Sequence, residues 1–404
     1  MKGRTNVPFF SSEMRITIGP ACGIIHGMDR HKFSNQARLP GTTTSFFDTL
    51  LRLDAFVQKI PTPVFAGLLF VFALYPSLGN LQLAFLLWVF FIIDWISIRL
   101  LSYTHKSYGP AKPPTLMLAM LRLPFALLPL PLNMIAQFAG TLLVVYGFWI
   151  EPHYVHVTKQ TMQSAKLKLG VPPLRVLHLG DLHVERITQR ERKVVELARS
   201  LKPDVILFSG DFLNLSNVHD PVSWEHARTI LGELDAPLGV FAVSGSPPVD
   251  QLPIVGKLLE GLSIRWLRNE RVSLSHHGEA IDIVGITCTH KPHEDGADLD
   301  AILQGDPEDF TILLYHTPDL APEAAAQGVD LQLSGHTHGG QVRLPIFGAL
   351  YTSSLYGKRF EMGRYNVKDM TLYVTRGIGL EGKGAPRVRF LCPPEVVIWE
   401  ISAS

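Results

Sequence analysis

The chain has 404 residues, and its 37 Lys and Arg nearly balance its 36 Asp and Glu, so the formal charge is +1 and the pI about 7.8. This balance, without a basic tract interleaved with aromatic residues, argues against nucleic-acid binding. Only 18% of the residues are charged and the mean hydropathy is +0.18, which is unusual for a fully soluble protein. The cysteines Cys22, Cys288 and Cys392 are too widely spaced for a Cys-x-x-Cys metal site or a disulfide framework.

Residues 1–60 form the first predicted region. Residues 1–44 lack an apolar segment behind their early basic residues, so we predict no signal peptide and expect much of this stretch to be disordered. Apolar residues then recur at helical spacing: Phe46, Phe47, Leu50, Leu53 and Val57. This pattern predicts an amphipathic helix that either lies in a membrane interface or packs against other helices.

Residues 61–151 form the second predicted region, an all-α transmembrane part. Two apolar blocks, 64–98 and 116–150, are each too long for one span and suit two short ones of ~18–20 residues. Turn-forming residues divide them at 76–80 and near 131–133. We therefore predict about four transmembrane helices in two hairpins. A buried helical core in a soluble protein is the alternative.

The basic residues indicate the topology of these spans. They lie before, between and after the two hairpins, whereas the tight turns have none: Arg52, Lys59, Arg99, Lys106, Lys112, Lys159, Lys166 and Lys168. With an even number of spans, the positive-inside tendency places both termini and the C-terminal domain on the cytoplasmic side of the membrane.

Two charged residues interrupt the apolar blocks. Asp94 either has a function inside the membrane or lies at its surface near Arg99, and with Arg122 it is the only support for a channel or transporter. Arg122 and the prolines 124, 129 and 131 make the third span poor, so a re-entrant segment is the alternative there.

Residues 172–404 alternate apolar runs with helical patterns, which predicts an α/β domain with functional loops at the strand ends. The expected strands are 175–179, 205–208, 239–243, 281–286, 311–314, 331–333, 371–374 and 395–401. The expected helices are 190–200, 222–234 and 321–327. The pair His276 and His277 before Gly278 predicts a hairpin turn.

Metal-ligand residues follow four of these strands. They are Asp181 and His183, Asp211, His316, and His336 with His338. Carboxylates mixed with imidazoles suit Mn²⁺, Fe or Zn²⁺ better than Ca²⁺ or Mg²⁺. Two such ions ~3.5–4 Å apart can hold a hydroxide and bind a phosphoryl group. We therefore predict two divalent metal ions at this end of the domain.

The ordered motifs, ending in Gly-His-Thr-His-Gly-Gly-Gln, resemble the calcineurin-like metallophosphoesterase superfamily and its membrane-associated branch over residues 172–401. The run 375–379 and the pairs 389–390 and 394–395 also resemble that branch. The resemblance implies a β-sandwich flanked by helices. It also implies Asp181, His183 and His338 on one metal, Asp211 as a bridge, and His316 and His336 on the other.

The chain departs from the family at its third motif, Gly-Asn-His followed by an acidic residue. Ser246 stands where the ligand Asn is expected and Pro247 where a phosphate-binding His is expected. Proline offers no side-chain donor or acceptor. Asp250, His290 and His293 are candidates to compensate, whereas His178, inside a strand, is expected to be a core histidine.

Two functions follow from this pattern. The first is a membrane-anchored phosphoesterase acting on a phosphodiester, pyrophosphate or phosphomonoester, with a lipid-linked substrate favoured by the membrane region; the resemblance extends to hydrolases of UDP-diacylglucosamine. The second is a degenerate phosphoesterase that binds metal and phosphate with little turnover, as a regulatory or binding module. The sequence does not identify the substrate or the oligomeric state.

Overall fold

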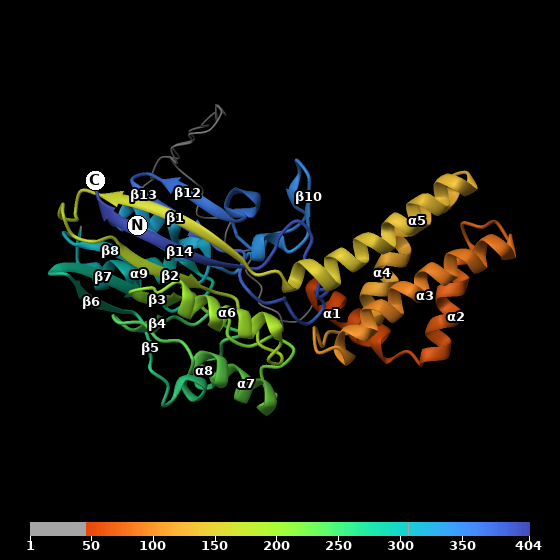
Figure 1. The fold of residues 1–404 in the computed structure, drawn as a ribbon, viewed down its shortest axis with the longest axis horizontal. Helices are drawn as coiled ribbons and strands as arrows, with labels where there is room; N and C mark the ends of the chain where they lie inside the picture. Colours follow the sequence, from red (N-terminus) through yellow and green to blue (C-terminus); the bar gives the residue numbers. More distant parts are fainter. Residues whose placement is uncertain (1–45, 306) are drawn as a thin grey trace, which may run out of the picture.

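The structure, a computed structural model, describes residues 46–404 except residue 306, with side chains from residue 52. The predictions for residues 1–44 and for Cys22 lie outside the described residues. A helical part and a sheet part lie end to end along the long axis (Figure 1). The helix expected from Phe46 is present as α1 (Phe46–Lys59). Cys288 and Cys392 are buried free thiols.

The helical part continues with α2 (Thr62–Leu74), α3 (Leu81–Tyr103), α4 (Lys112–Arg122) and α5 (Leu130–Val145). The predicted turn at 76–80 separates α2 from α3, and Asn80 caps α3 by accepting hydrogen bonds from two backbone N–H groups. The second break was predicted near residues 131–133 but lies earlier, at 123–129. Pro131 instead occupies the first turn of α5, where a proline costs no hydrogen bond.

Among the described residues, two helical stretches are long and apolar enough to cross a membrane, Leu81–Tyr103 and Leu130–His153. A third candidate is the pair Arg52–Lys59 and Thr62–Leu74, which is bent by 109°. With 11 residues, α4 is about 16 Å long and cannot cross a hydrocarbon core of ~30 Å by itself. The prediction of about four spans stays a prediction, as does the topology.

Asp94 and Arg122 form a buried ion pair where α3, α4 and α5 meet. Their N–O distance is 2.7 Å, and Thr141 and Gln137 on α5 also contact the Arg122 guanidinium. Arg99 contacts Tyr103 instead of Asp94. Removing one partner of a buried ion pair typically costs about 3–5 kcal/mol, so loss of either residue would destabilise the contact among the three helices.

The sheet part is a sandwich of two six-stranded sheets. The first has the order β1 (His156–Ser164), β14 (Glu395–Ala403), β2 (Leu174–Leu179), β3 (Val205–Phe208), β4 (Val240–Ala242) and β5 (Ile264–Trp266). The second has the order β12 (Gly363–Val367), β13 (Met370–Val374), β9 (Leu331–Ser334), β8 (Phe310–Leu314), β7 (Glu279–Gly285) and β6 (Glu270–His276). A small hairpin joins β10 (Arg343–Leu344) and β11 (Gly348–Ala349).

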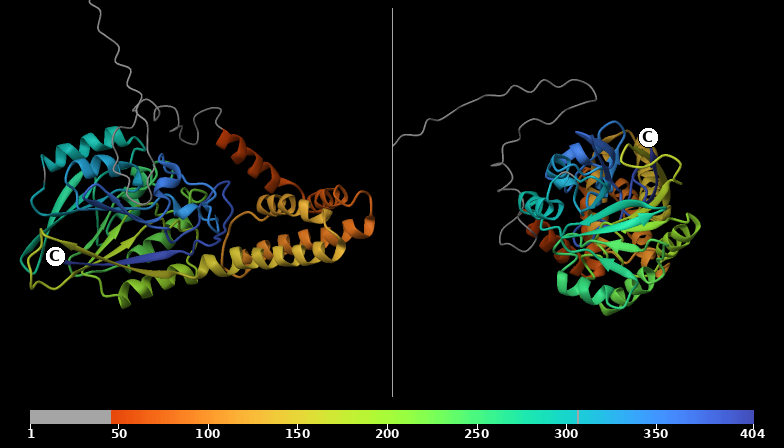
Figure 2. Two further views of the ribbon diagram at one scale, coloured as in Figure 1. Left: turned by 90° about the horizontal axis from the view of Figure 1, so that it is seen from above. Right: turned by 90° about the vertical axis from the view of Figure 1, so that its left-hand side faces the viewer.

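Helices cover both outer faces of the sandwich (Figure 2). Strand alternation divides the core: Val176 points between the sheets, whereas Leu177 points to the helices on the outer face of the first sheet. Those helices are α6 (Gln189–Ser200), α7 (Pro221–Leu231) and α8 (Leu252–Leu259). The second sheet carries α9 (Pro292–Leu303) and α10 (Ala321–Ala326). The predicted α/β sandwich with flanking helices is confirmed.

Every strand and helix predicted within residues 172–404 is present, with ends shifted by at most a few residues. The hairpin turn predicted at His277 lies between β6 and β7, with positive φ at His277 and Gly278. β1 was missed, because its partly exposed polar alternation gives little signal and its partner β14 lies far away in the sequence. The first sheet therefore begins at His156, ahead of the predicted domain start at residue 172.

Candidate metal centre

The six predicted ligands meet at one end of the sandwich, in the loops that follow β2, β3, β8 and β9. The first group consists of Asp181, His183 and His338, and the second group consists of Asp211, His316 and His336. Within each group, the candidate ligand atoms lie within 4.8 Å of one another. Parallel strands with their carboxyl ends at one edge bring these loops together.

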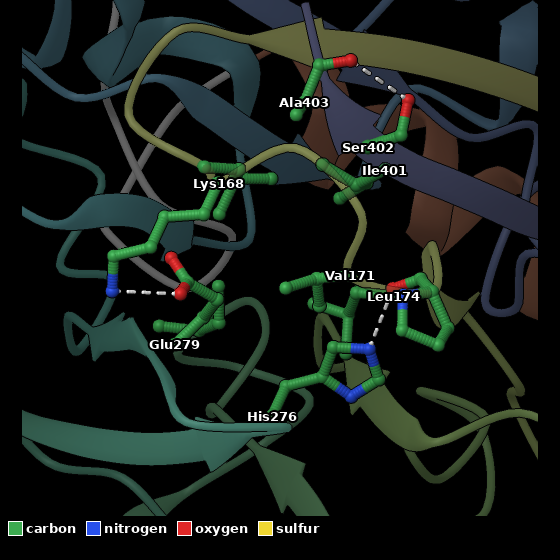
Figure 3. A pocket seen from close by; sticks show the side chains of 11 residues that line it. Lys168, Val171, Leu174, His276, Glu279, Ile401, Ser402 and Ala403 are labelled. Carbon is green, nitrogen blue, oxygen red and sulfur yellow. Dashed lines mark hydrogen bonds and ion pairs between the residues drawn. The ribbon is translucent and has the colours of Figure 1, made fainter.

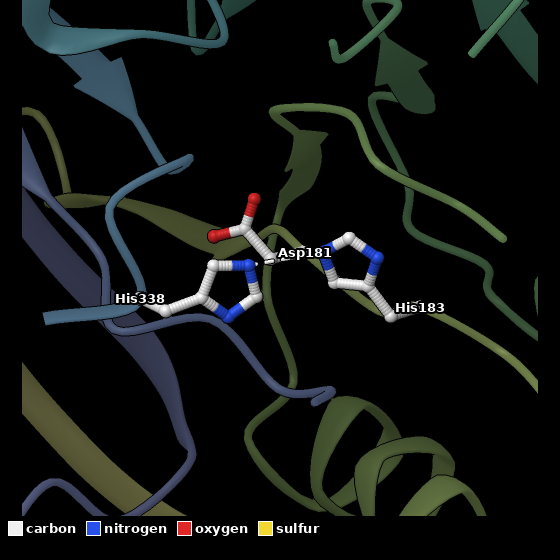
Figure 4. A group of neighbouring side chains, drawn as sticks. All are labelled: Asp181, His183 and His338. Atoms are coloured by element: carbon white, nitrogen blue, oxygen red, sulfur yellow. Dashed lines mark hydrogen bonds between the residues drawn. The ribbon is translucent and has the colours of Figure 1, made fainter. Parts of the chain in front are cut away.

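In the first group, two imidazoles face each other (Figure 4). The Nε2 atoms of His183 and His338 are 2.9 Å apart, and the rings are stacked with centroids 4.8 Å apart. Burial, with the neighbouring His183 and Arg389, holds the pKa of His338 well below its usual value. His338 is therefore neutral at pH 7, which is the form that ligates a metal ion.

In the second group, a serine oxygen joins the ligands. The Ser246 Oγ lies 3.0 Å from Nε2 of His316 and 3.2 Å from Nδ1 of His336. This is the residue that stands where the family motif has Asn. A neutral oxygen is thus retained beside the second group, although it is carried on a shorter side chain.

Asp211, a member of the second group, also faces the first group. Its Oδ2 is 3.3 Å from Nε2 of His316 and 3.5 Å from Nε2 of His183. Burial opposes the charge on Asp211, but the histidines around it hold its pKa well below the usual range. In return, although burial acts against it, the Asp211 carboxylate raises the pKa of His316 to about 9. One carboxylate oxygen is therefore within reach of both groups.

The backbone at these ligands is strained. Five of the six ligands have φ in the left-handed region, between +44° and +71°: Asp181, His183, Asp211, His336 and His338. Non-glycine residues rarely adopt this conformation, and such strain persists only where surrounding structure fixes it. The loops therefore hold the side chains inward at a cost of order 1–3 kcal/mol per residue.

Two glycines make the close packing of the carboxylates possible. A Cβ on Gly335 would lie 2.6 Å from Oδ2 of Asp181, and one on Gly245 would lie 2.1 Å from Oδ1 of Asp211. Neither contact is compatible with a side chain. These positions explain why glycine precedes His336 and Ser246.

Neighbouring polar groups fix the ligands. The Asp181 carboxylate accepts the backbone N–H of His336, and Nδ1 of His316 is 2.8 Å from the Ser209 carbonyl, which directs Nε2 toward the second group. Asp250 accepts backbone N–H groups of Asp211 and Gly245, both at 2.7 Å. Asp250 therefore holds two loops together, and its carboxylate is directed at the backbone.

Among the candidates to compensate for Pro247, only His290 reaches the site. Its ring packs edge-on against His336, with centroids 4.9 Å apart, and its Nε2 has no hydrogen-bond partner among the described residues. Burial and the nearby His316 lower the pKa of His290 to about 4. His293 is largely exposed and lies 3.8 Å from Glu294. His178 is buried against Ser209, as expected of a core histidine.

Two residues beside the first group were not predicted as site residues. Oε2 of Glu381 lies 3.7 Å from Nε2 of His338 and 3.9 Å from Nε2 of His183, and its side chain is 31% exposed. The fully buried Arg389 donates to the carbonyls of Gly377 and Gly379 and lies 3.5 Å from Nδ1 of His338. A lone Glu in a glycine-rich loop has no motif that could have revealed it.

A small hollow at the opposite end of the sandwich carries no comparable chemistry (Figure 3). Its polar residues are already paired: Lys168 with Glu279 at 2.9 Å, and His276 with the Pro172 carbonyl at 3.0 Å. The remaining lining is mostly apolar. The metal-ligand groups therefore remain the candidate site.

Comparison with known proteins agrees with this geometry. Residues 174–340, which contain all six candidate ligands, match the family model of the calcineurin-like phosphoesterases. The chain carries a calcineurin-like metallophosphoesterase domain. Calcineurin-like phosphoesterases use divalent metals, and the two groups of Asp and His side chains are candidates to hold them.

Three curated relatives are similar to this chain. The uncharacterised metallophosphoesterase YkuE of Bacillus subtilis is 29% identical over 278 residues, which cover 64% of this chain and 90% of the relative. The UDP-2,3-diacylglucosamine pyrophosphatase LpxG of Chlamydia trachomatis is 26% identical over 322 residues, covering 64% and 93%. The phosphodiesterase YaeI of Escherichia coli is 28% identical over 275 residues, covering 63% and 92%.

Proposed function

We propose that this protein is a membrane-anchored phosphoesterase that uses two divalent metal ions, Mn, Fe or Zn. Its reaction is hydrolysis of a phosphodiester, pyrophosphate or phosphomonoester bond. The observation that carries this proposal is the position of Asp211, whose Oδ2 lies 3.3 Å from a ligand atom of the second group and 3.5 Å from one of the first. A carboxylate shared in this way suits two adjacent ions.

The residues around the groups fit such a site. Two divalent ions held there would polarise a phosphoryl oxygen and lower the pKa of a bound water. Asp181 and Asp211 supply negative charge in a buried setting, the imidazoles supply neutral donors, and Ser246 supplies a neutral oxygen to the second group. The partly exposed Glu381 carboxylate, 3.7 Å from Nε2 of His338, is a further oxygen donor beside the first group.

Membrane anchoring and a lipid-linked substrate belong to the same proposal. Two candidate spans lead into the domain, and α5 continues almost directly into β1. LpxG, named for a pyrophosphatase activity on a lipid-linked nucleotide, matches along 93% of its length. We place the domain on the cytoplasmic side, because the basic residues flank the predicted hairpins on one face.

One observation favours a second function, a degenerate module with little turnover. Pro247 removes the imidazole that the family places beside the second group, and His290 does not replace it as an acid, because its pKa of about 4 leaves it neutral at pH 7. Acid–base assistance typically contributes ~10²–10⁴-fold, so its loss slows hydrolysis without preventing metal binding.

Hydrolysis of a generic phosphodiester by the full chain, in detergent with Mn²⁺, separates the two functions. We expect slow turnover that Asp211→Asn abolishes, because that change removes the shared ligand. Asp204→Asn is the matched control, since Asp204 lies away from the site, where its carboxylate accepts the backbone N–H of Arg175. Equal rates for wild type and Asp211→Asn would contradict the enzyme function and favour the degenerate binding module.

A further inference from the structure

The β10–β11 segment, residues 343–351, forms an exposed apolar hairpin. Within the described residues from 156 onward, nine large apolar side chains are exposed, and five of them lie in this hairpin: Leu344, Ile346, Phe347, Leu350 and Tyr351. Clusters of this kind on a folded domain mark an interaction surface. The hairpin is therefore a candidate interaction surface.

The backbone conformation of the hairpin tip also indicates an interaction surface. Ile346 is fully exposed and has φ of +68°, although a β-branched residue adopts this region only at a cost. A turn selected for folding alone would carry Gly or Asn at such a position. The adjoining Gly348, at φ of +79°, shows that the turn uses glycine elsewhere.

The root of the hairpin joins the metal groups to the helices. Val342 follows His338 by four residues and packs against a cluster of Ile98, Leu101, Val144, Phe148 and Val388. Ile98 and Leu101 end α3, whereas Val144 and Phe148 end the α5 stretch. On the other side, the Ser353 hydroxyl donates to the His336 carbonyl. The residues that flank the hairpin thus contact both the ligand-bearing loop and the domain-proximal ends of both candidate spans.

Near the root of the hairpin, the protein carries the residue types that are typical of a membrane interface. Lys106 lies over the Trp149 ring, at 5.9 Å, beside the end of the α5 stretch. Aromatic and basic residues together are typical of the boundary between hydrocarbon and headgroups. Beside the hairpin, Lys358 lies over the Phe347 ring at 3.5 Å. Lys358 and Arg343 face a single carboxylate, that of Glu361, so a net positive charge accompanies the apolar tip. This combination matches an anionic lipid surface.

A second element at this level is also apolar and exposed. α1 presents Leu53 and Phe56 to the outside. Lys112, the first residue of α4, donates to the Gln58 carbonyl at 3.1 Å and so connects the C-terminal end of α1 to α4. Figure 1 shows α1 and β10 at the junction of the two parts. Two segments far apart in sequence therefore expose apolar side chains near one boundary.

We propose that the apolar hairpin inserts into the lipid bilayer that α3 and α5 cross. Ile346 and Phe347 enter the acyl region, and Lys358 remains among the headgroups. The metal groups, a few residues from the hairpin root, are thereby held beside the headgroup layer. The substrate class is then a lipid-linked phosphoester reached from the membrane; this second statement rests on the proposed function, whereas the insertion does not.

Lipid contact is tested with the full chain in nanodiscs made of equal phosphatidylcholine and phosphatidylglycerol. In a Cys22→Ser background, Ile346→Cys is labelled with an environment-sensitive fluorophore, and Leu169→Cys is the control, because Leu169 is equally apolar and 81% exposed. We expect a nitroxide on the acyl chains to quench the label at residue 346 several-fold more than the label at 169.

Equal quenching at the two positions would overturn the insertion. A label at 346 that is shielded from water but not quenched by the nitroxide would also overturn it, because a second copy or another protein would then cover the hairpin. Labelling is confined to the new cysteines, since Cys288 and Cys392 are buried.

The substrate class is tested with Ile346→Asp/Phe347→Asp, and Leu169→Asp as the control. We expect hydrolysis of a lipid-linked pyrophosphate in vesicles to fall by about tenfold or more, because charged residues at the tip oppose insertion. Hydrolysis of a water-soluble phosphodiester should stay unchanged. Equal losses on both substrates would contradict the proposal. A wild type inactive on both would refute the proposed function instead, and the quenching result would still decide the insertion.

Discussion

The two metal-ligand groups lie side by side yet differ in completeness. The first group retains every ligand of the family pattern and is backed by the buried Arg389. Beside the second group, Ser246 and Pro247 stand where the resemblance leads us to expect an amide ligand and an imidazole. The comparison teaches that all six predicted ligand residues can be brought together while a neighbouring loop departs from the expected motif.

The largest effect is expected from the complete group. His338→Ala removes an imidazole whose Nε2 faces that of His183, and with it the first ion. Because a bound metal supplies several kcal/mol of charge stabilisation, hydrolysis should fall about 10³-fold or more. Steady-state assays at saturating Mn²⁺ measure this. His178→Ala, a core change outside the groups, controls for folding. Activity that survives His338→Ala would show that the first group is not the reacting one.

Restoring the diverged loop should act in the opposite direction. Ser246→Asn with Pro247→His rebuilds the family motif beside the second group. Since acid–base assistance contributes ~10²–10⁴-fold, we expect kcat to rise about 10²-fold. Each single change provides a control, and the imidazole accounts for most of the gain. A double variant no faster than wild type would mean that the second group does not limit turnover.

The groups should also differ in their dependence on pH. Metal must displace a proton from His316, whose pKa is raised to about 9, whereas His338 is already neutral. The affinity of the second group should therefore rise about tenfold per pH unit between pH 7 and 9. The affinity of the first should level off above pH 6, the approximate pKa to which burial raises Asp181.

Calorimetric Mn²⁺ titrations in two buffers of different ionisation enthalpy report this proton release. The stability of the metal-free fold changes with pH in the opposite direction to metal affinity. The raised pKa of His316 stabilises the fold below pH ~6.5, and that stability is lost as pH rises through about 9. Identical proton release at both sites would contradict the difference between the groups.

The smallest effect is expected from Ser246→Ala. It removes the oxygen 3.0 Å from Nε2 of His316 and leaves the first group untouched. Loss of a neighbouring polar group typically weakens metal binding ~10–100-fold, and a lone hydroxyl belongs at the low end of that range. Equilibrium dialysis of Mn²⁺ should therefore show one weakened ion per chain, with the other unchanged. If both ions weaken equally, Ser246 supports the whole loop instead of the second group.

Much of this site could be predicted, because its ligands follow short apolar strands and carry motifs of fixed spacing. His183 and His338 are 155 residues apart, yet each follows a strand whose place in a parallel sheet is predictable. The pairing of strands that lie far apart in the sequence could not be predicted in this way. β1 pairs with β14 from the far end of the chain, and Glu381 approaches the first group from a loop without a motif. The break before α5 was misplaced, because Pro131 is tolerated in a first helical turn.

Counting bound metal tests the central claim most directly. The full chain is loaded with Mn²⁺ at pH 8, freed of excess ion by desalting, and measured by mass spectrometry of the metal, with Asp211→Asn alongside. We predict two ions per wild-type chain and fewer in the variant, because Asp211 is within reach of both groups. A wild-type chain that retains one ion or none would contradict a site built on two adjacent metals.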